Sequence, residues 1–338
     1  MPKTLRQLFV EQYGLCRLAA TETVGVIAEL GRKEEYVAAA VEAAHDLGAG
    51  ALVLTASSLS YPMLPPYDPR GAGREVGALL AGAGECDLVI DATVGGLIHS
   101  DVRTRITGKG KRMLFVAEPP DVLERLMGGE SLKQTVLRAG QRLRLGARLH
   151  VTSDAGTDLT ADISGDALPI THQWGFVDEP GRWDHWPSGF VACFPKDRSA
   201  QGTIVLQPGD ALVPFNRYVS QPVRIEVRDG FIVDMQGDGL DAANLRDYFE
   251  TWHDPDAWAV SHMGWGMHPS ASWAALDVYD GRRIYGQELR STSGNFMWST
   301  GSNRFAGRET PAHLDIPMRA CTVRVDDHVV VERGRLAD

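Results

Sequence analysis

The chain has 338 residues, which is enough for about two domains and a hydrophobic core that needs no disulfide or structural metal. Its formal net charge of -10 argues against a nucleic-acid partner, because such partners favour a basic surface. No stretch approaches the roughly 20 apolar residues that cross a bilayer, so we expect no membrane contact. The cysteines are scattered and the start of the chain lacks the pattern of a signal peptide, so we expect reduced thiols in a cytoplasmic protein.

The first 147 residues alternate between short apolar runs and amphipathic helical patterns. The predicted strands lie at 23–28, 51–55, 87–91 and 113–117, and the predicted helices at 32–46, 75–81 and 131–145. The run at 51–55 (ALVLT) is continuous, as is typical of a strand covered on both faces. Ser131 and Gln134 match a capping box at the start of the last helix. Residues 1–147 are therefore predicted to form a Rossmann-like α/β domain, with a mostly parallel sheet and helices on both sides.

The glycine-rich segments of this half do not match nucleotide-binding motifs. GAGREVG (71–77) is not G-x-G-x-x-G and does not directly follow a strand, and GKGKR (108–112) lacks the spacing of a P-loop. A fold alone does not set a function. We therefore interpret the first domain as a scaffold.

Residues 148–338 have a different character, with short β-type runs separated by Gly, Asp and Pro. Asp229-Gly230 predicts a turn between VRIEV and FIVDM, and one helix is predicted over 240–251. The stretch 258–308 holds many Gly, Trp, Met and Ser residues and shows little periodicity. Irregular backbone often carries function, so a strand-rich α+β domain with a site near this stretch is predicted.

Three side chains of the second half are candidate metal ligands. His313 and Asp315 point to the same side if their segment is extended, because side chains alternate along a strand. His262 lies close to glycines that allow unusual backbone approach. Two imidazoles and one carboxylate form the ligand set of non-haem Fe(II) oxygenases, but zinc accepts the same donors. A plain His–Asp hydrogen bond in a sheet explains the H-x-D pair equally well.

Two further histidines are candidates for proton transfer. His185 stands between Trp183 and Trp186 in a segment that looks too irregular for a strand, and an imidazole can titrate near neutral pH. Packing between aromatic rings is its alternative role. His99 follows the predicted strand at 87–91, where ligands gather in open α/β sheets, and is a weaker candidate for the same site.

Several motifs of the second half occur in the order found in one family. The segments are GTDLTADISG (156–165), WPSGFVACFP (186–195), SAQGTIVL (199–206), HMGWGMHP (262–269) and HLDIPM (313–318). With them the chain resembles the M29 (aminopeptidase T) metallopeptidases, and more closely their oxygenase relatives, the 2,5-dihydroxypyridine 5,6-dioxygenases. The first half matches only in general architecture.

The departures from the peptidase pattern concern metal ligands. His262 stands where the peptidases have a metal-binding glutamate, Met297 where they have a metal-binding histidine, and Phe190 where they have the glutamate of Pro-Ser-Gly-Glu. A thioether is a poor ligand for a second hard dication. The resemblance therefore implies one metal bound by His262, His313 and Asp315, and it disfavours peptidase activity.

The resemblance to the dioxygenases implies a mononuclear Fe(II) enzyme of the extradiol type. Its substrates would be O2 and 2,5-dihydroxypyridine, or a close hydroxylated N-heterocycle, with N-formylmaleamate as the product. His185, with His99 as second candidate, would transfer protons, and relatives imply a homo-oligomer. The alternatives are a metal-dependent aminopeptidase or amidase of the M29 type, and a non-enzymatic binding protein on the same scaffold.

Overall fold

The computed structural model describes residues 2–57, 75–97, 100–116, 118–213, 215–281 and 284–337. The chain divides into two compact units. Unit 1 comprises Met1–Glu130, Gln173–Ser188 and Arg283–Gln287, and unit 2 comprises Ser131–His172, Gly189–Arg282 and Glu288–Asp338. Among the described residues, no helix has the length and apolar character needed to cross a membrane. All four cysteines are free and buried.

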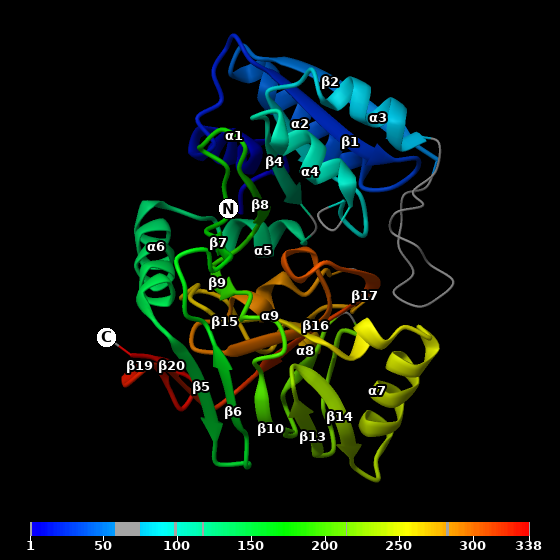
Figure 1. The fold of residues 1–338 in the computed structure, drawn as a ribbon. Coiled ribbons are helices and arrows are strands. Elements are labelled where there is room, and N and C mark those ends of the chain that lie inside the picture. Colours follow the sequence, from blue (N-terminus) through cyan, green and yellow to red (C-terminus); the bar gives the residue numbers. More distant parts are fainter. Residues whose placement is uncertain are drawn as a thin grey trace. The chain divides into compact units, whose positions relative to one another are not determined.

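Unit 1 is built on a five-stranded sheet in the order β2-β1-β3-β4-β8, in which every pair is parallel (Figure 1). Its strands are β1 (Thr23–Glu29), β2 (Gly50–Ala56), β3 (Leu88–Asp91), β4 (Arg112–Val116) and β8 (Trp183–Trp186). The first four coincide with the predicted apolar runs. The predicted parallel α/β sheet is therefore confirmed.

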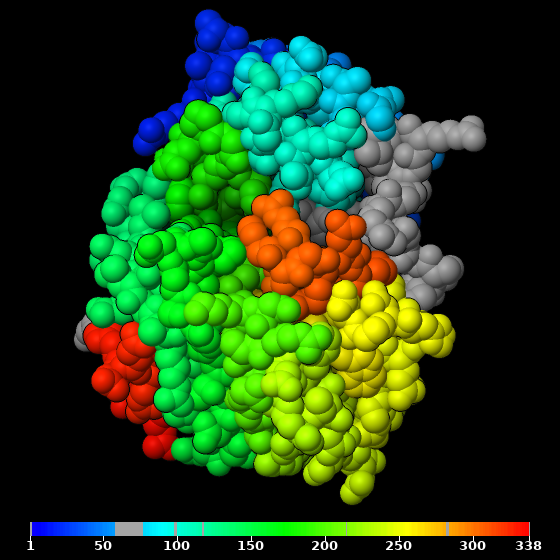
Figure 2. Space-filling model, in the orientation of Figure 1, coloured from blue at the N-terminus to red at the C-terminus, as the bar shows by residue number. Residues whose placement is uncertain are grey.

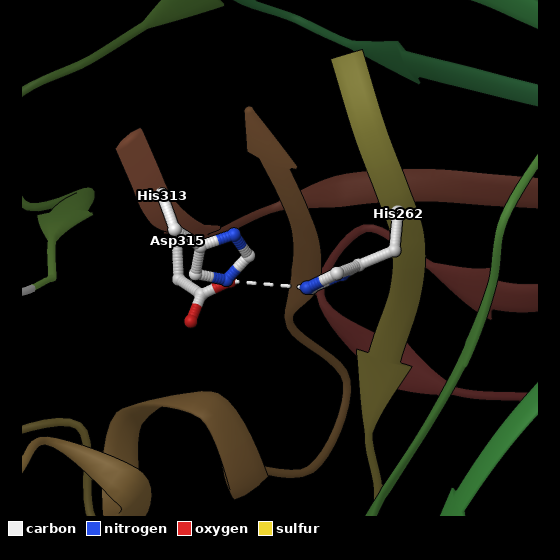
Figure 3. Close-up of side chains that lie close together, drawn as sticks. All are labelled: His262, His313 and Asp315. Carbon is white, nitrogen blue, oxygen red and sulfur yellow. Dashed lines mark ion pairs between the residues drawn. The ribbon is translucent and has the colours of Figure 1, made fainter. Parts of the chain in front are cut away.

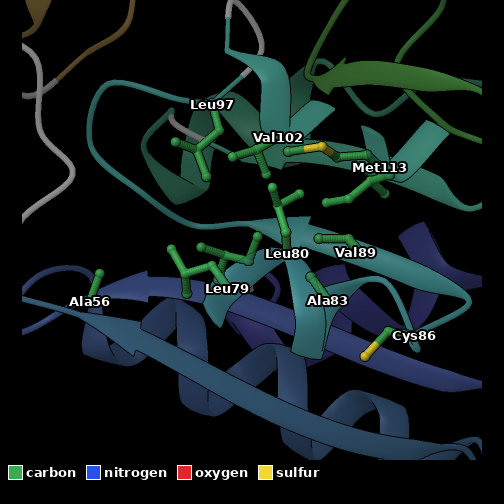
Figure 4. Close-up of a cluster of buried hydrophobic side chains, with 11 residues drawn as sticks. Ala56, Leu79, Leu80, Ala83, Cys86, Val89, Leu97, Val102 and Met113 are labelled. Atoms are coloured by element: carbon green, nitrogen blue, oxygen red, sulfur yellow. The ribbon is translucent and has the colours of Figure 1, made fainter. Parts of the chain in front are cut away.

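Helices cover both faces of this sheet. α1 (Leu5–Leu15) and α2 (Glu34–Asp46) lie on one face, and α3 (Glu75–Ala83) and α4 (Asp101–Gly108) on the other (Figure 4). α5 (Pro120–Arg125) follows β4. On the second face, buried side chains of α3 and α4 pack on those of β1, β3 and β4: Ile27, Leu79, Leu80, Ala83, Val89, Val102, Ile106 and Met113. The glycine-rich segment at 71–77 lies largely outside the described residues.

Two local predictions are wrong, one for the strand β2 and one for the helix predicted over 131–145. Leu52 and Val53 of β2 are 40% and 41% exposed, because β2 is the edge strand of the sheet rather than a covered central one. The predicted helix start at Ser131 is also wrong, since α6 (Glu130–Leu145) already begins at Glu130 and Ser131 is not its N-cap. Ser131 instead lies in the first turn, where its carbonyl oxygen accepts a hydrogen bond from Thr135 Oγ1 at 3.0 Å.

The units interleave along the chain, whereas the sequence predicts one boundary after residue 147. Residues 173–188 return to unit 1 because β8 extends its sheet by pairing with β4. The segment around His185 is thus a strand, and the expected irregular conformation is wrong. The four residues of β8 are too few to show the alternation of polar and apolar residues that indicates a strand. Most of α6, by contrast, belongs to unit 2.

The larger sheet of unit 2 has eight strands in the order β14-β13-β10-β6-β5-β18-β19-β20. They are β5 (Arg148–Ser153), β6 (Asp158–Asp162), β10 (Gln201–Leu206), β13 (Val223–Arg228), β14 (Phe231–Gln236), β18 (Cys321–Val325), β19 (His328–Glu332) and β20 (Arg335–Leu336). Asp229 and Gly230 join β13 to β14 with φ of 49° and 74°, so the predicted turn is confirmed. Helix α7 (Leu240–Thr251) has the predicted bounds and lies at the surface beside β14 (Figure 2, yellow).

The second sheet of unit 2 has the order β17-β16-β15-β9-β7. Its strands are β7 (Ile170–Gln173), β9 (Phe190–Cys193), β15 (Val260–Gly266), β16 (Phe296–Asn303) and β17 (Arg308–Met318). Two strands thus fall in the stretch 258–308, which shows no periodicity in the sequence. The reason is that β15 and β16 are buried almost throughout, so polar and apolar residues do not alternate. Short elements of this part of the chain include β11 (Ala211–Leu212), β12 (Arg217–Tyr218), α8 (Ala275–Val278) and α9 (Gln287–Ser291), whose first residue belongs to unit 1.

The carboxylate of Asp184 fastens the segment that returns to unit 1. Its Oδ2 accepts hydrogen bonds from the backbone N–H groups of Trp174 at 2.9 Å and Gly175 at 3.2 Å, and from Arg182 Nη2 at 2.8 Å. Its Oδ1 accepts from the backbone N–H of His185 at 2.8 Å. Asp184 is fully buried. One ionised side chain therefore holds both ends of this segment.

We predict that Asp184→Asn lowers the free energy of unfolding by about 3 kcal/mol, because in either orientation the new NH2 group faces a buried N–H donor and Arg182 loses its negatively charged partner. Urea unfolding followed by circular dichroism and fluorescence measures the loss. Asp327→Asn at an exposed position is the matched control and should stay within about 0.5 kcal/mol of the wild type. A change below about 1 kcal/mol in Asp184→Asn would show that the network is not structurally important.

Candidate metal centre

Two histidines and one aspartate of unit 2 come together from β15 and β17, the strands on either side of β16 (Figure 3). Nε2 of His262 and Nε2 of His313 each lie 3.3 Å from Oδ1 of Asp315. The two imidazole centroids are 5.4 Å apart, and one possible ligand atom from each residue lies within 4.8 Å of the others. The three residues singled out from the sequence therefore converge on one point, with His313 and Asp315 on the same side of β17.

A β-bulge aims His262 at the other two side chains. Val260 pairs with Thr300 and Met263 with Trp298, so two residues of β15 oppose one residue of β16. The extra residue cannot make a regular ladder bond, and the His262 N–H instead donates to the Ser299 hydroxyl at 3.0 Å. A bulge re-aims side chains and is common beside functional sites.

The outer edge of β17 is held by residues outside the sheet. The Tyr248 hydroxyl donates to the carbonyl oxygen of His313 and accepts from the His313 N–H, both at 3.1 Å. At Asp315 the backbone of Val213 exchanges two hydrogen bonds, of 2.9 and 3.0 Å. Edge strands usually leave such groups to water. Here the outward-facing main-chain groups of His313 and Asp315 are all hydrogen-bonded.

Arg290 of α9 holds the second oxygen of the Asp315 carboxylate. Its Nε donates to Oδ2 at 2.6 Å, and both side chains are buried. Burial raises the pKa of Asp315, but Arg290 and the two imidazoles outweigh it and hold that pKa well below the usual range. Burial, together with the charges of His313 and Arg290, lowers the pKa of His262 by more than Asp315 raises it. The ionised carboxylate and neutral imidazole are the states that bind metals.

The donor set fits a single cation. Asp315 Oδ1 is buried and makes no well-formed hydrogen bond with any residue that the structure describes. A buried anionic oxygen without such a partner is costly, and a cation between it and the two imidazoles would satisfy it. The three side chains then supply two nitrogens and one oxygen, while Arg290 keeps Oδ2 from becoming a second ligand.

His185, one of the two histidines predicted to transfer protons, is not one of the three converging residues. His185 belongs to β8 in unit 1, whereas the three converging residues belong to unit 2. His99 lies outside the described residues. The His185 ring is buried and stacks on Tyr285, with centroids 5.9 Å apart and planes at 29°. Phe115 and Trp183 meet it edge-on at 5.7 Å.

Three supporting residues have no signal in the sequence: Ser299, Tyr248 and Arg290. Helical periodicity predicts α7 correctly, but it does not reveal that Tyr248 reaches a backbone 65 residues away. Arg290 belongs to a five-residue helix, too short for a recognisable pattern. Each contact depends on tertiary packing rather than on local sequence.

Comparison with known proteins gives three results. The family model described as 2,5-dihydroxypyridine 5,6-dioxygenase matches residues 4–338. The curated 2,5-dihydroxypyridine 5,6-dioxygenase of Pseudomonas putida (strain KT2440) is 38% identical over 337 residues, covering 98% of this chain and 95% of that protein. The solved structure of 2,5-dihydroxypyridine dioxygenase from the same strain aligns with a TM-score of 0.92 at 37% identity, over 98% of this chain and 96% of that one.

A more distant solved structure, wild-type AmpT from Thermus thermophilus, aligns with a TM-score of 0.62 over 99% of both chains. At 14% identity this likeness shows a common fold and nothing about activity. The α/β first half and the strand-rich second half thus form the aminopeptidase-like fold expected from the sequence motifs.

We predict that Tyr248→Phe weakens metal binding by about tenfold, because the main chain of His313 loses both of its bonds to the hydroxyl. Competition with a chromophoric chelator measures the dissociation constant. Tyr218→Phe is the matched control, since the described bonds of that hydroxyl are to the carbonyl oxygen of Trp273 and the N–H of Leu276. Equal affinity in the two variants would show that Tyr248 does not support the ligand.

Proposed function

Because the chain belongs to the 2,5-dihydroxypyridine 5,6-dioxygenase family, we propose that it cleaves the ring of 2,5-dihydroxypyridine, or of a close hydroxylated N-heterocycle, with O2. The product from 2,5-dihydroxypyridine would be N-formylmaleamate, which retains both oxygen atoms of O2. The observation that carries the proposal is the convergence of His262, His313 and Asp315 in a chain matched by this family over nearly its whole length.

The proposed metal is a single Fe(II) ion held by these three side chains. Two imidazoles and one carboxylate form the set that non-haem Fe(II) oxygenases use, with positions left open for substrate and O2. When bound, Fe(II) supplies the redox chemistry with O2 that amino-acid side chains lack. Zinc fits the same donors, but it has no redox chemistry with which to react O2.

An apolar cluster supports one metal rather than two. Phe190 and Met297, which stand where the peptidases carry a glutamate and a histidine ligand, pack together with Ala192 in the core of unit 2. Phe190 is 6% exposed and Met297 fully buried. Without carboxylate or imidazole there, a second hard dication has no ligands from these positions. This packing argues against the alternative, a two-metal aminopeptidase or amidase.

His185 is the proposed acid–base group for the substrate hydroxyl. An imidazole can both accept and donate a proton, and the aromatic neighbours of His185 keep its ring in one orientation. His99 remains the second candidate from the sequence. A homo-oligomer and a cytoplasmic location also belong to this proposal. The four free buried thiols support the location.

We predict that the protein, purified without oxygen and loaded with Fe(II), consumes O2 and 2,5-dihydroxypyridine in equal amounts. An oxygen electrode and the absorbance of the substrate follow the two losses together. Zn(II)-loaded protein and His313→Ala should show neither loss, because each lacks the redox metal at the site. Iron-loaded protein that leaves this substrate and related diols unchanged while releasing amino acids from a peptide panel would support the hydrolase instead.

We predict that His185→Gln lowers kcat at least about 100-fold while the iron content stays that of the wild type. Glutamine keeps a hydrogen-bonding side chain of similar reach but does not titrate. Steady-state rates and metal analysis on the same sample separate the two effects. A variant with normal kcat would remove His185 from the reaction, and a variant without iron would assign it to the metal centre.

A further inference from the structure

Four buried side chains of unit 1 form a continuous hydrogen-bond chain that ends at His185. Gln287 Nε2 donates to Ser188 Oγ at 3.3 Å, and Ser188 Oγ donates to Gln173 Oε1 at 3.2 Å. The same Gln173 oxygen lies 2.9 Å from His185 Nδ1. Gln173, Ser188 and Gln287 are each at most 1% exposed. Such a chain, shielded from water, leaves little freedom in the placement of its protons.

The direction in which the hydrogen-bond chain donates decides which imidazole nitrogen of His185 carries the proton. An amide NH2 group can only donate, so Ser188 accepts from Gln287 and must pass its own proton onward. The acceptor is the amide oxygen of Gln173, which has no proton to give. His185 Nδ1, facing that oxygen, must therefore be the N–H donor, which leaves the lone pair of the neutral ring on Nε2.

Backbone contacts hold the far end of this chain in place. The Glu118 carboxylate accepts hydrogen bonds from the N–H of Gln287 at 2.6 Å and of Tyr285 at 3.3 Å. Residues 285–287 therefore supply both the ring that stacks on His185 and the donor that begins the chain. At the other end, Asp184 accepts from the backbone N–H of His185.

We propose that Gln173 is a positioning residue that keeps His185 protonated on Nδ1 and so presents Nε2 as the proton-accepting atom. This deepens the proposed function, because it assigns the atom of His185 that exchanges a proton with the substrate. A ring held in the other tautomer would offer a donor where the reaction needs an acceptor.

The surroundings of His185 allow the effect of an added negative charge on its ring to be tested. His185 has ring contacts with three neutral side chains, Phe115, Trp183 and Tyr285. Charged groups near it among the described residues include Asp184 at its backbone, Arg182 paired with Asp184, Glu118 behind Tyr285, and Lys33 against the ring of Phe115. Gln173 itself is neutral. A carboxylate in its place adds one negative charge directly on Nδ1, which favours the imidazolium form.

The first test determines the tautomer of His185 by spectroscopy and does not depend on enzyme activity. Full-length Zn(II)-loaded protein with 15N-labelled histidine is compared with the same sample of His185→Gln, which identifies the His185 signals by their loss. We expect a protonated Nδ1 and an unprotonated Nε2 in the wild type, and a mixture of tautomers in Gln173→Leu. A neutral ring with its proton on Nε2 in the wild type would overturn the proposal, since the hydrogen bonds would then donate in the reverse direction.

The second test reads the pH profile of kcat/KM in the Fe(II)-loaded enzyme. Gln173→Glu keeps the acceptor and should move the acidic limb upward by about one pH unit. Gln173→Leu removes the acceptor and should lower kcat at least about tenfold at unchanged iron content. Gln7→Glu, at an exposed helix start of the same unit, is the matched control and should match the wild-type profile.

The two proposals fail in different ways. An unshifted acidic limb in an active Gln173→Glu enzyme would overturn the role of Gln173 and leave the proposed function intact. Wild-type enzyme that never consumes O2 would overturn the proposed function, while the histidine spectra would still decide the tautomer.

Discussion

The carboxylate of Asp315 is the group on which the candidate centre depends. It is buried and ionised, with Arg290 on one oxygen and two imidazole nitrogens 3.3 Å from the other. A buried negative charge is stable only with such partners. The arrangement divides the carboxylate into an oxygen that is already satisfied and an oxygen that faces the histidines. One cation, held by one oxygen and two nitrogens, would complete it.

Irregularities of the sheet, rather than its regular parts, position this group. A bulge in β15 turns His262 toward β17, and Ser299 replaces the ladder bond that the bulge removes. The outer edge of β17 would normally face solvent, but Tyr248 and the backbone of Val213 occupy it. Ligand groups fixed through their main chain lose little freedom on binding, which favours a preorganised site.

The sequence predicts those elements whose conformation is determined by residues close together in the chain. The strands β1, β3 and β4, the turn at Asp229-Gly230 and helix α7 follow from apolar runs, turn chemistry and helical period. Alternation along an extended segment also places His313 and Asp315 on one face. The bulge at His262, the short strand at His185 and the contacts of Arg290 depend on partners far along the chain, so no local pattern indicates them.

The number of metal ions per chain tests the central claim most directly. Protein purified without oxygen, loaded with excess Fe(II) and freed of unbound metal should contain one iron per chain by elemental analysis. Asp315→Asn, which keeps the shape of the side chain but removes its charge, should contain none. Two metal ions per wild-type chain, or full iron occupancy in Asp315→Asn, would contradict a single centre built on this carboxylate.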